Sequence, residues 1–109
     1  MGLIDSVNTF RKRRKVYTLE ELSSIVAPIA ERYGTGPIQV FGSYARGEAT
    51  PESDIDLLIT PGEIKSYFKF ATLAADLEEA FGKKVDAVSS GCSQRFIDII
   101  HMDLVTIYE

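Results

Sequence analysis

Residues 54–57 alternate acidic and aliphatic side chains at the start of an apolar run that continues to Ile59, and this pattern limits the folds that are open to the chain. In an extended strand, side chains two residues apart point to the same side, about 7 Å apart along the chain. Asp54 and Asp56 would therefore lie on one face of a strand. The opposite face carries Ile55, Leu57 and Ile59. The segment predicts a strand whose apolar face packs on a core while its acidic face stays open.

The rest of the chain alternates between helical and strand-like patterns. Thr18 and Glu21 form a capping-box pattern, which begins a helix that ends before Gly34. Helical spacing predicts further helices over 63–81 and over 96–100, the last capped by Ser93. The expected strands are 38–41, 54–60, 85–89 and 104–108, and residues 42–53 are expected to form a loop. This order predicts an α+β domain, in which helices pack on a small mixed sheet of about four strands.

Charge is distributed unevenly along the 109 residues. Residues 1–16 hold five basic side chains and one acidic one, which predicts a flexible basic arm or leader ahead of a single domain over 17–109. That domain carries seven basic and fifteen acidic side chains. Such a body repels the phosphates of nucleic acids and favours metal cations or a basic protein partner.

The cysteine content and the length of the apolar runs indicate the cellular compartment of the protein. The single cysteine, Cys92, cannot form an internal disulfide, as is typical of proteins in a reducing cytoplasm. No apolar run is long enough for a transmembrane helix or a secretory signal. We therefore expect a cytoplasmic protein with no membrane partner.

Residues 42–59 resemble two common motifs, the phosphate-binding P-loop and the calcium-binding loop, but lack a required residue of each. The spacing of Gly42 and Gly47 imitates a P-loop, but Glu48 occupies the position of the phosphate-binding lysine. A calcium loop that starts at Asp54 would require glycine where Ile59 stands. The chemistry of this segment must therefore be of another kind.

Three carboxylates on neighbouring strands point to a metal site. Two like charges on one strand face, as at Asp54 and Asp56, are costly unless cations lie between them. Asp86 is the only acid inside the strand expected over 85–89. Oxygen-only ligands favour Mg²⁺ or Mn²⁺, and three such carboxylates can hold two ions for an in-line displacement at phosphorus.

The residues that follow the strand over 38–41 suggest a phosphate cradle. Gly42 lacks a Cβ, so phosphates can approach closely, and the backbone N–H groups and hydroxyl of Ser43 can donate to them. Arg46 either adds a charge-assisted contact to the phosphates or pairs with Glu48 or Glu52.

Gly42-Ser43, Arg46-Gly47 and Ser53-Asp54-x-Asp56 closely resemble the signature of the minimal nucleotidyltransferases in the DNA polymerase beta-like superfamily. The resemblance covers about residues 17–109 and implies the nucleotidyltransferase fold. It implies Mg²⁺-dependent transfer of AMP from ATP to an acceptor hydroxyl, with release of pyrophosphate. Asp54 and Asp56 match the metal-binding pair of the family. Asp86 matches the third carboxylate, which helps to activate the acceptor.

The resemblance also implies a partner. Members are often encoded beside a helical HEPN-domain protein and resemble antitoxins, and some adenylylate a tyrosine of that ribonuclease toxin. The expected function is therefore that of an adenylyltransferase antitoxin. One alternative is a non-catalytic antitoxin that neutralises its partner by complex formation, and another is transfer to a nucleic acid or to a small hydroxylated molecule. The sequence leaves open the preferred base, the acceptor hydroxyl and the oligomeric state, a homo-oligomer included.

Overall fold

A computed structural model describes residues 15–91 and 103–109 of the chain. The expected helix over 96–100 and its cap at Ser93 lie outside the described residues, as do Cys92 and most of the basic N-terminal segment.

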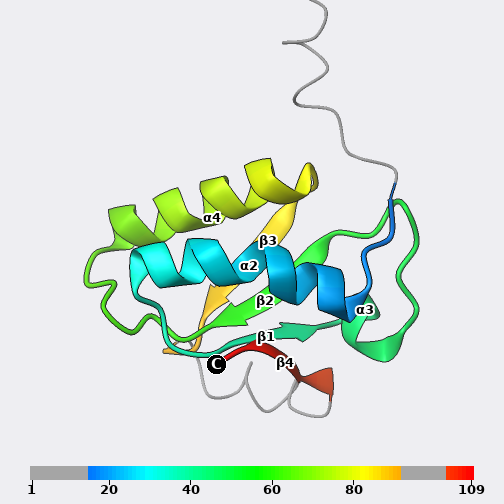
Figure 1. Cartoon of the computed structure of the whole chain (residues 1–109), viewed down its shortest axis with the longest axis horizontal. Helices are drawn as coiled ribbons and strands as arrows, with labels where there is room; N and C mark the ends of the chain where they lie inside the picture. The colour runs from blue at the N-terminus through cyan, green and yellow to red at the C-terminus, as the bar shows by residue number, and fades with distance from the viewer. Residues whose placement is uncertain (1–14, 92–102) are drawn as a thin grey trace, which may run out of the picture.

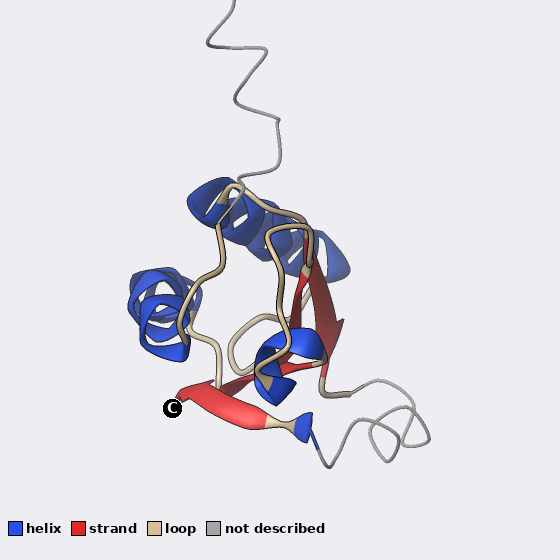
Figure 2. Cartoon of the chain, turned by 90° about the vertical axis from the view of Figure 1, so that its right-hand side faces the viewer, coloured by secondary structure: helices blue, strands red, loops and turns tan. Residues whose placement is uncertain are grey.

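The described chain forms a mixed four-stranded sheet with two long helices on one face (Figures 1 and 2). The elements in chain order are α2 (Leu19–Tyr33), β1 (Ile38–Phe41), α3 (Ser43–Arg46), β2 (Ile55–Ile59), α4 (Tyr67–Phe81), β3 (Val85–Ser89) and β4 (Val105–Tyr108). The sheet order is β3-β2-β1-β4, in which β2 and β3 run parallel and the other neighbours run antiparallel. The α+β architecture expected from the sequence is confirmed.

The start of α2 is fixed by the capping box. Oγ1 of Thr18 accepts the N–H of Glu21 at 3.0 Å, and the Glu21 carboxylate accepts the N–H of Thr18 at 2.9 Å. A cap of this kind contributes about 1 kcal/mol to stability. Tyr17 and Leu22 flank the cap and are both buried, which is the position of a hydrophobic staple. Gly34 ends the helix in the left-handed conformation at φ 72°.

The second long helix starts later than the sequence pattern over 63–81 predicted. α4 begins at Tyr67 because the side chain of Ser66 accepts the N–H of Lys69 at 3.1 Å and caps the helix there. The preceding residues form a turn that places Ile64 in the core, 7% exposed. An apolar residue in that turn therefore extended the helical pattern without being part of the helix.

The prediction of a loop over 42–53 was also wrong in part, because residues 43–46 form the short helix α3. Gly42 turns the chain at φ 72°, the N–H of Arg46 bonds to the Gly42 carbonyl at 3.1 Å, and Gly47 ends the turn at φ 73°. A single helical turn is too short to produce an apolar repeat, and Tyr44 is its one buried residue.

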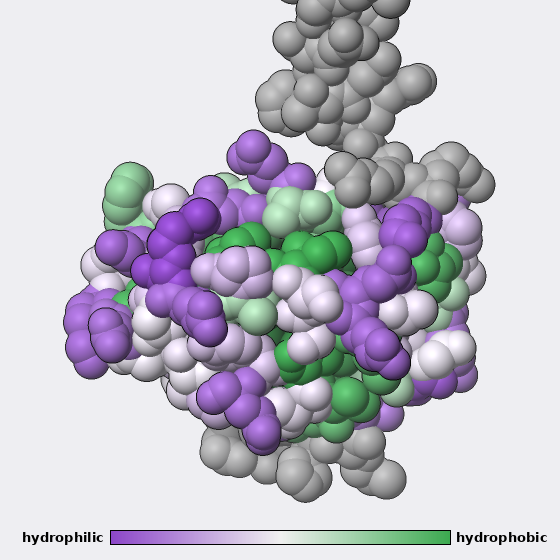
Figure 3. All heavy atoms as spheres, in the orientation of Figure 1, coloured by the Kyte–Doolittle hydropathy of each residue, from purple (hydrophilic) through white to green (hydrophobic). Residues whose placement is uncertain are grey.

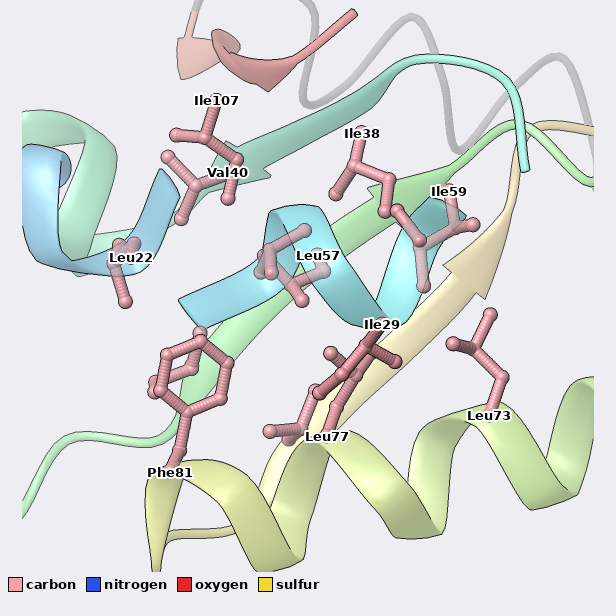
Figure 4. Close-up of a cluster of buried hydrophobic side chains, with 14 of the residues drawn as sticks. Leu22, Ile29, Ile38, Val40, Leu57, Ile59, Leu73, Leu77, Phe81 and Ile107 are labelled. Carbon is pink, nitrogen blue, oxygen red and sulfur yellow. The ribbon is translucent and has the colours of Figure 1, made fainter. Parts of the chain in front are cut away.

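The core lies between the sheet and the two long helices (Figure 4). Its labelled members are Leu22, Ile29, Ile38, Val40, Leu57, Ile59, Leu73, Leu77, Phe81 and Ile107. Truncation of a fully buried leucine in such a core typically costs 2–5 kcal/mol. Because Ile55, Leu57 and Ile59 of β2 point into this core, the side chain of Asp56 must point to the opposite face of the sheet.

The face formed by α2 and α4 is a mixture of polar and apolar side chains (Figure 3). Two aromatic residues at the start of α4 are largely exposed, Tyr67 by 90% and Phe68 by 80%. Within residues 15–91 and 103–109, neither long helix has the length and apolar character that a membrane crossing requires.

Candidate active site

The sheet register aligns two acidic residues on the face away from the core. Phe41 of β1 pairs with Asp56 of β2, and Asp56 pairs in turn with Asp86 of β3. Residues that are directly paired across neighbouring strands point to the same side of a sheet. The structure therefore brings together Asp56 and Asp86, two of the three carboxylates that the sequence predicted.

Gly42 lies directly against the Asp56 carboxylate. Its backbone has φ 72° and ψ −147°, close to a region that is accessible essentially only to glycine. A Cβ at this position would collide with Oδ2 of Asp56. The end of β1 thus approaches the carboxylate so closely that any side chain at position 42 would displace it. The missing Cβ of Gly42 makes room for the Asp56 carboxylate, whereas the sequence led us to expect that it makes room for phosphates.

Asp54 precedes β2, and hydrogen bonds fix the backbone both before and after it. Residues 50–53 form a turn that is closed by two hydrogen bonds of 2.9 Å. After Asp54, the N–H of Ile55 bonds to the carbonyl of Lys84 at 3.0 Å. The negative charge of Asp54 contributes to the raised pKa of Asp56, so the two groups interact electrostatically.

The pKa of Asp56 is raised to about 6, first by burial and then by the neighbouring carboxyl groups of Asp86 and Asp54. Arg46 acts in the opposite direction and lowers this pKa. A carboxyl group shifted in this way carries a poorly solvated negative charge in the folded chain. A bound cation would stabilise that charge.

We expect the unfolding free energy of the wild type to fall, relative to that of Asp56→Asn, as the pH rises from about 4 to about 6. Over that interval the folded state keeps a proton on Asp56 that the unfolded state has released, so stability is lost as pH rises. Urea denaturation without divalent cations measures the difference. The two proteins should be equally stable near the low end, and the asparagine variant more stable at neutral pH. A difference that does not change with pH would contradict the raised pKa.

Ser43 and Arg46 lie at the two ends of α3. Ser43 directly follows the glycine that contacts the Asp56 carboxylate, and the contact of its hydroxyl group with phosphates stays a prediction. Arg46 donates from Nε to Glu48 at 2.9 Å and also reaches Asp103 at 3.3 Å. The ion pair with Glu48 is one of the two roles expected for Arg46, and the phosphate contact stays a prediction.

The donor set fits a magnesium ion that is completed by a substrate. In the described part of the chain, no three acidic, histidine or cysteine side chains form a ready metal cage. Mg²⁺ does not need one, because it usually keeps several waters and binds one or two carboxylates together with substrate phosphates. The oxygen donors of Asp56 and Asp86, which pair across β2 and β3, suit that mode of binding, and Asp54 is the third carboxylate expected there.

A groove of about 1120 Å³ borders Asp56 and Asp86. Its walls come from the edge strand β3, from Phe41 at the end of β1, and from α4, where Tyr67 and Phe70 line it. Grooves of this size accommodate nucleotide-sized ligands or an incoming side chain.

Sequence reasoning assigned no role to Lys83. This residue is 3% exposed, and its ammonium donates to the carbonyl of Pro51 at 3.1 Å and to Oη of Tyr44 at 3.4 Å. A lysine beside a helix-ending glycine is ordinarily a solvated turn residue. Its burial depends on segments far away in sequence, so no local pattern signals it.

Comparison with known proteins gives the family. Residues 19–108 match the model of the nucleotidyltransferase domain. The chain is 47% identical over 75 residues to the protein adenylyltransferase MntA of Thermococcus cleftensis, a match that covers 65% of this chain and 76% of that protein. It is 37% identical over 81 residues to MJ1215 of Methanocaldococcus jannaschii, which is proposed to be a protein adenylyltransferase, with 71% of this chain and 94% of that protein covered.

Solved structures share the fold. One that is proposed to be a minimal nucleotidyltransferase is 34% identical, with a TM-score of 0.68 over 82% of this chain and 95% of that chain. A toxin–antitoxin with AMP-PNP is 20% identical, with a TM-score of 0.69 over 79% of this chain and 72% of that chain, and shows the fold alone. Because the family model spans both long helices and all four described strands, the chain belongs to the nucleotidyltransferase family and is an enzyme with the polymerase beta-like fold.

Proposed function

We propose that this chain transfers AMP from ATP to a hydroxyl group of a protein, using Asp54, Asp56 and Asp86 with Mg²⁺. The observation that carries the proposal is the pairing of Asp56 with Asp86 beside Gly42, at the edge of a groove. The relative from Thermococcus cleftensis, which is named a protein adenylyltransferase, supports the choice of nucleotide and of acceptor class.

The residues around Asp56 would hold the nucleotide and the metal. Asp54 and Asp56 would bind Mg²⁺, with two ions expected in the complete site and Mn²⁺ as a substitute. When bound, the ions neutralise charge on the phosphates and orient the in-line displacement. Gly42 brings the end of β1 against the Asp56 carboxylate, and the N–H and hydroxyl of the following Ser43 would donate hydrogen bonds to a phosphate of the nucleotide.

The reaction replaces one phosphorus–oxygen bond with another. The acceptor oxygen forms a bond to the α-phosphorus of ATP, while the bond from that phosphorus to the bridging oxygen breaks and pyrophosphate leaves. The hydroxyl proton passes to the carboxylate of Asp86, whose side chain is 47% exposed and is therefore accessible to an incoming group. The groove along β3 and α4 is the route by which we expect that group to enter.

The proposed acceptor is a tyrosine of an HEPN-type ribonuclease partner. An acidic domain favours a basic partner, and a protein that holds RNA needs positive charge to do so. Among structures of the same fold is a tri-AMPylated Shewanella oneidensis HEPN toxin in complex with its MNT antitoxin. Since that match is only 17% identical, it supports the fold, and the partner of the present chain is our proposal.

Co-expression with an HEPN-type toxin from the same genome tests the proposal. We expect wild type and Asp56→Asn both to bind the toxin, but only wild type to restore growth and to add the mass of AMP to a toxin tyrosine. Glu31→Gln, at an exposed position on α2, is the control for removal of a carboxylate elsewhere and should behave as wild type. If Asp56→Asn restores growth equally well, the chain acts as a binding module and catalysis is not the means of neutralisation.

ATP with Mg²⁺ should raise the melting temperature of the chain more than Mg²⁺ alone does. Ligand at about 100 times its dissociation constant stabilises by about 2.7 kcal/mol, and each kcal/mol moves the Tm of a small domain by roughly 4–8 °C. Ser43→Ala should reduce the ATP shift by removing a hydrogen bond worth about 1 kcal/mol. Ser24→Ala, at an exposed serine of α2, should keep the full shift in the same thermal melts. No shift with millimolar ATP and Mg²⁺ would contradict the phosphate site.

A further inference from the structure

Lys83 is buried between the end of α4 and the start of β3. It is 3% exposed and is the one charged side chain that is buried in the part of the chain described by the structure. An ammonium group that is removed from water is costly unless hydrogen bonds compensate it. Lysine has three N–H donors, so the partners of those donors show what the burial achieves.

Two contacts of Lys83 fix the segment that leads into Asp54. Its Nζ donates to the carbonyl of Pro51 at 3.1 Å and to the carbonyl of Ser53 at 3.4 Å. Ser53 is the residue directly before Asp54. The ammonium therefore holds the backbone from which the first carboxylate of the site projects.

A third contact of Lys83 reaches α3. Nζ lies 3.4 Å from Oη of Tyr44 and 5.9 Å from the centroid of the Tyr44 ring. Tyr44 is 5% exposed and directly follows Ser43, the residue expected at the phosphates. The same hydroxyl accepts the N–H of Tyr17 at 3.4 Å, so α3 is anchored to the start of the domain as well.

We propose that Lys83 is a positioning residue, whose buried ammonium sets the place of the Asp54 segment relative to the α3 helix that carries Ser43. The inference rests on the proposed function, since it takes Asp54 and Ser43 as parts of the site. Lys83 acts through the carbonyls of residues 51 and 53 and through the Tyr44 hydroxyl. It links two segments that are brought together only by the tertiary fold.

A purely structural role for Lys83 predicts a different outcome from a positioning role. If the ammonium only stabilised the fold, its removal would lower the melting temperature but leave the nucleotide affinity and the kcat of the folded enzyme unchanged. If it positions Asp54 relative to Ser43, the folded variant must lose affinity for the metal–nucleotide complex and turn over more slowly. Geometry errors in supporting residues commonly cost ten-fold or more in rate or affinity.

The test uses Lys83→Met in the full chain, at a temperature well below its unfolding transition. We expect affinity for AMP-PNP with Mg²⁺, measured by calorimetry, to fall about ten-fold, and kcat for AMP transfer to fall by a similar factor. The Mg²⁺ concentration that gives half the maximal rate should rise. Lys83→Arg, which keeps the charge and the donors, should recover most of each loss. Lys69→Met, at an exposed lysine of α4, should match wild type.

The proposal would be overturned if folded Lys83→Met kept both its affinity for AMP-PNP and its kcat within about two-fold of the wild-type values. It would also be overturned if Lys83→Arg lost as much affinity and kcat as Lys83→Met. If Lys83→Met does not fold, Tyr44→Phe removes a single hydroxyl contact and should lower affinity and kcat about three-fold, whereas no change there contradicts the positioning role. If wild type binds the analogue but transfers no AMP, the proposed function fails. The binding loss in Lys83→Met then still tests the positioning role.

Discussion

Asp56→Asn should lower the rate of AMP transfer by about a thousand-fold or more while leaving the fold intact. The substitution removes a metal ligand, and charge stabilisation by a bound metal is worth several kcal/mol in a transition state. It also removes a negative charge that the folded chain solvates poorly, as the pKa of about 6 indicates. The melting temperature of the metal-free variant should therefore equal or exceed that of wild type at neutral pH.

Two measurements on the same preparations check this result. Transfer is followed as AMP incorporated into the acceptor protein, and stability is followed by thermal melts without divalent cations. The control is again Glu31→Gln, for which both quantities should be those of wild type. Near-normal transfer by the Asp56→Asn variant would contradict the assignment of Asp56 as a metal ligand.

Gly42→Ala should have the second largest effect, on stability and on activity together. Alanine at φ 72° and ψ −147° carries roughly 1–3 kcal/mol of backbone strain. Its Cβ would also collide with Oδ2 of Asp56, so the carboxylate must move from its place beside Asp86. We expect at least about a hundred-fold loss of transfer, since displacement by about 1 Å can cost that much.

Gly47→Ala is the matched control for Gly42→Ala. Gly47 has φ 73°, so alanine there is strained by about 1–2 kcal/mol, but a Cβ at Gly47 meets nothing within 4 Å. We expect lower stability with near-normal transfer from the folded protein. In an Asp56→Ala background the carboxylate is gone, so the stability cost of Gly42→Ala should shrink. Equal losses of transfer in the two alanine variants would contradict the close approach of Gly42 to Asp56.

The fold could be predicted largely because its long elements carry strong local signals. The capping box at Thr18 and the glycines that follow α2 and α4 mark helix ends by short-range hydrogen bonds and backbone conformation. α3 could not be predicted, since its four residues hold too few apolar side chains for a repeat. The parallel pairing of β2 with β3 depends on how α4 connects them, which periodicity does not encode.

The acidic residues of the candidate site were predictable from alternation, and the groups that support them were not. Asp54 and Asp56 lie two apart beside apolar residues, and Asp86 is the lone acid of its strand, so sequence alone selects them. Lys83 differs, because its partners lie about thirty and forty residues earlier in the chain. Tertiary contacts over such separations leave no periodic trace in sequence.

The most direct test of the proposed chemistry uses ATP labelled at either the α- or the γ-phosphate, with Mg²⁺ and a purified HEPN-type partner. We expect the α-label to appear on a tyrosine of the partner with wild type, and neither label to appear with Asp56→Asn. The γ-label should leave with pyrophosphate. Transfer of the γ-label, or α-label transfer that is unaffected by Asp56→Asn, would contradict AMP transfer at the Asp54, Asp56 and Asp86 site.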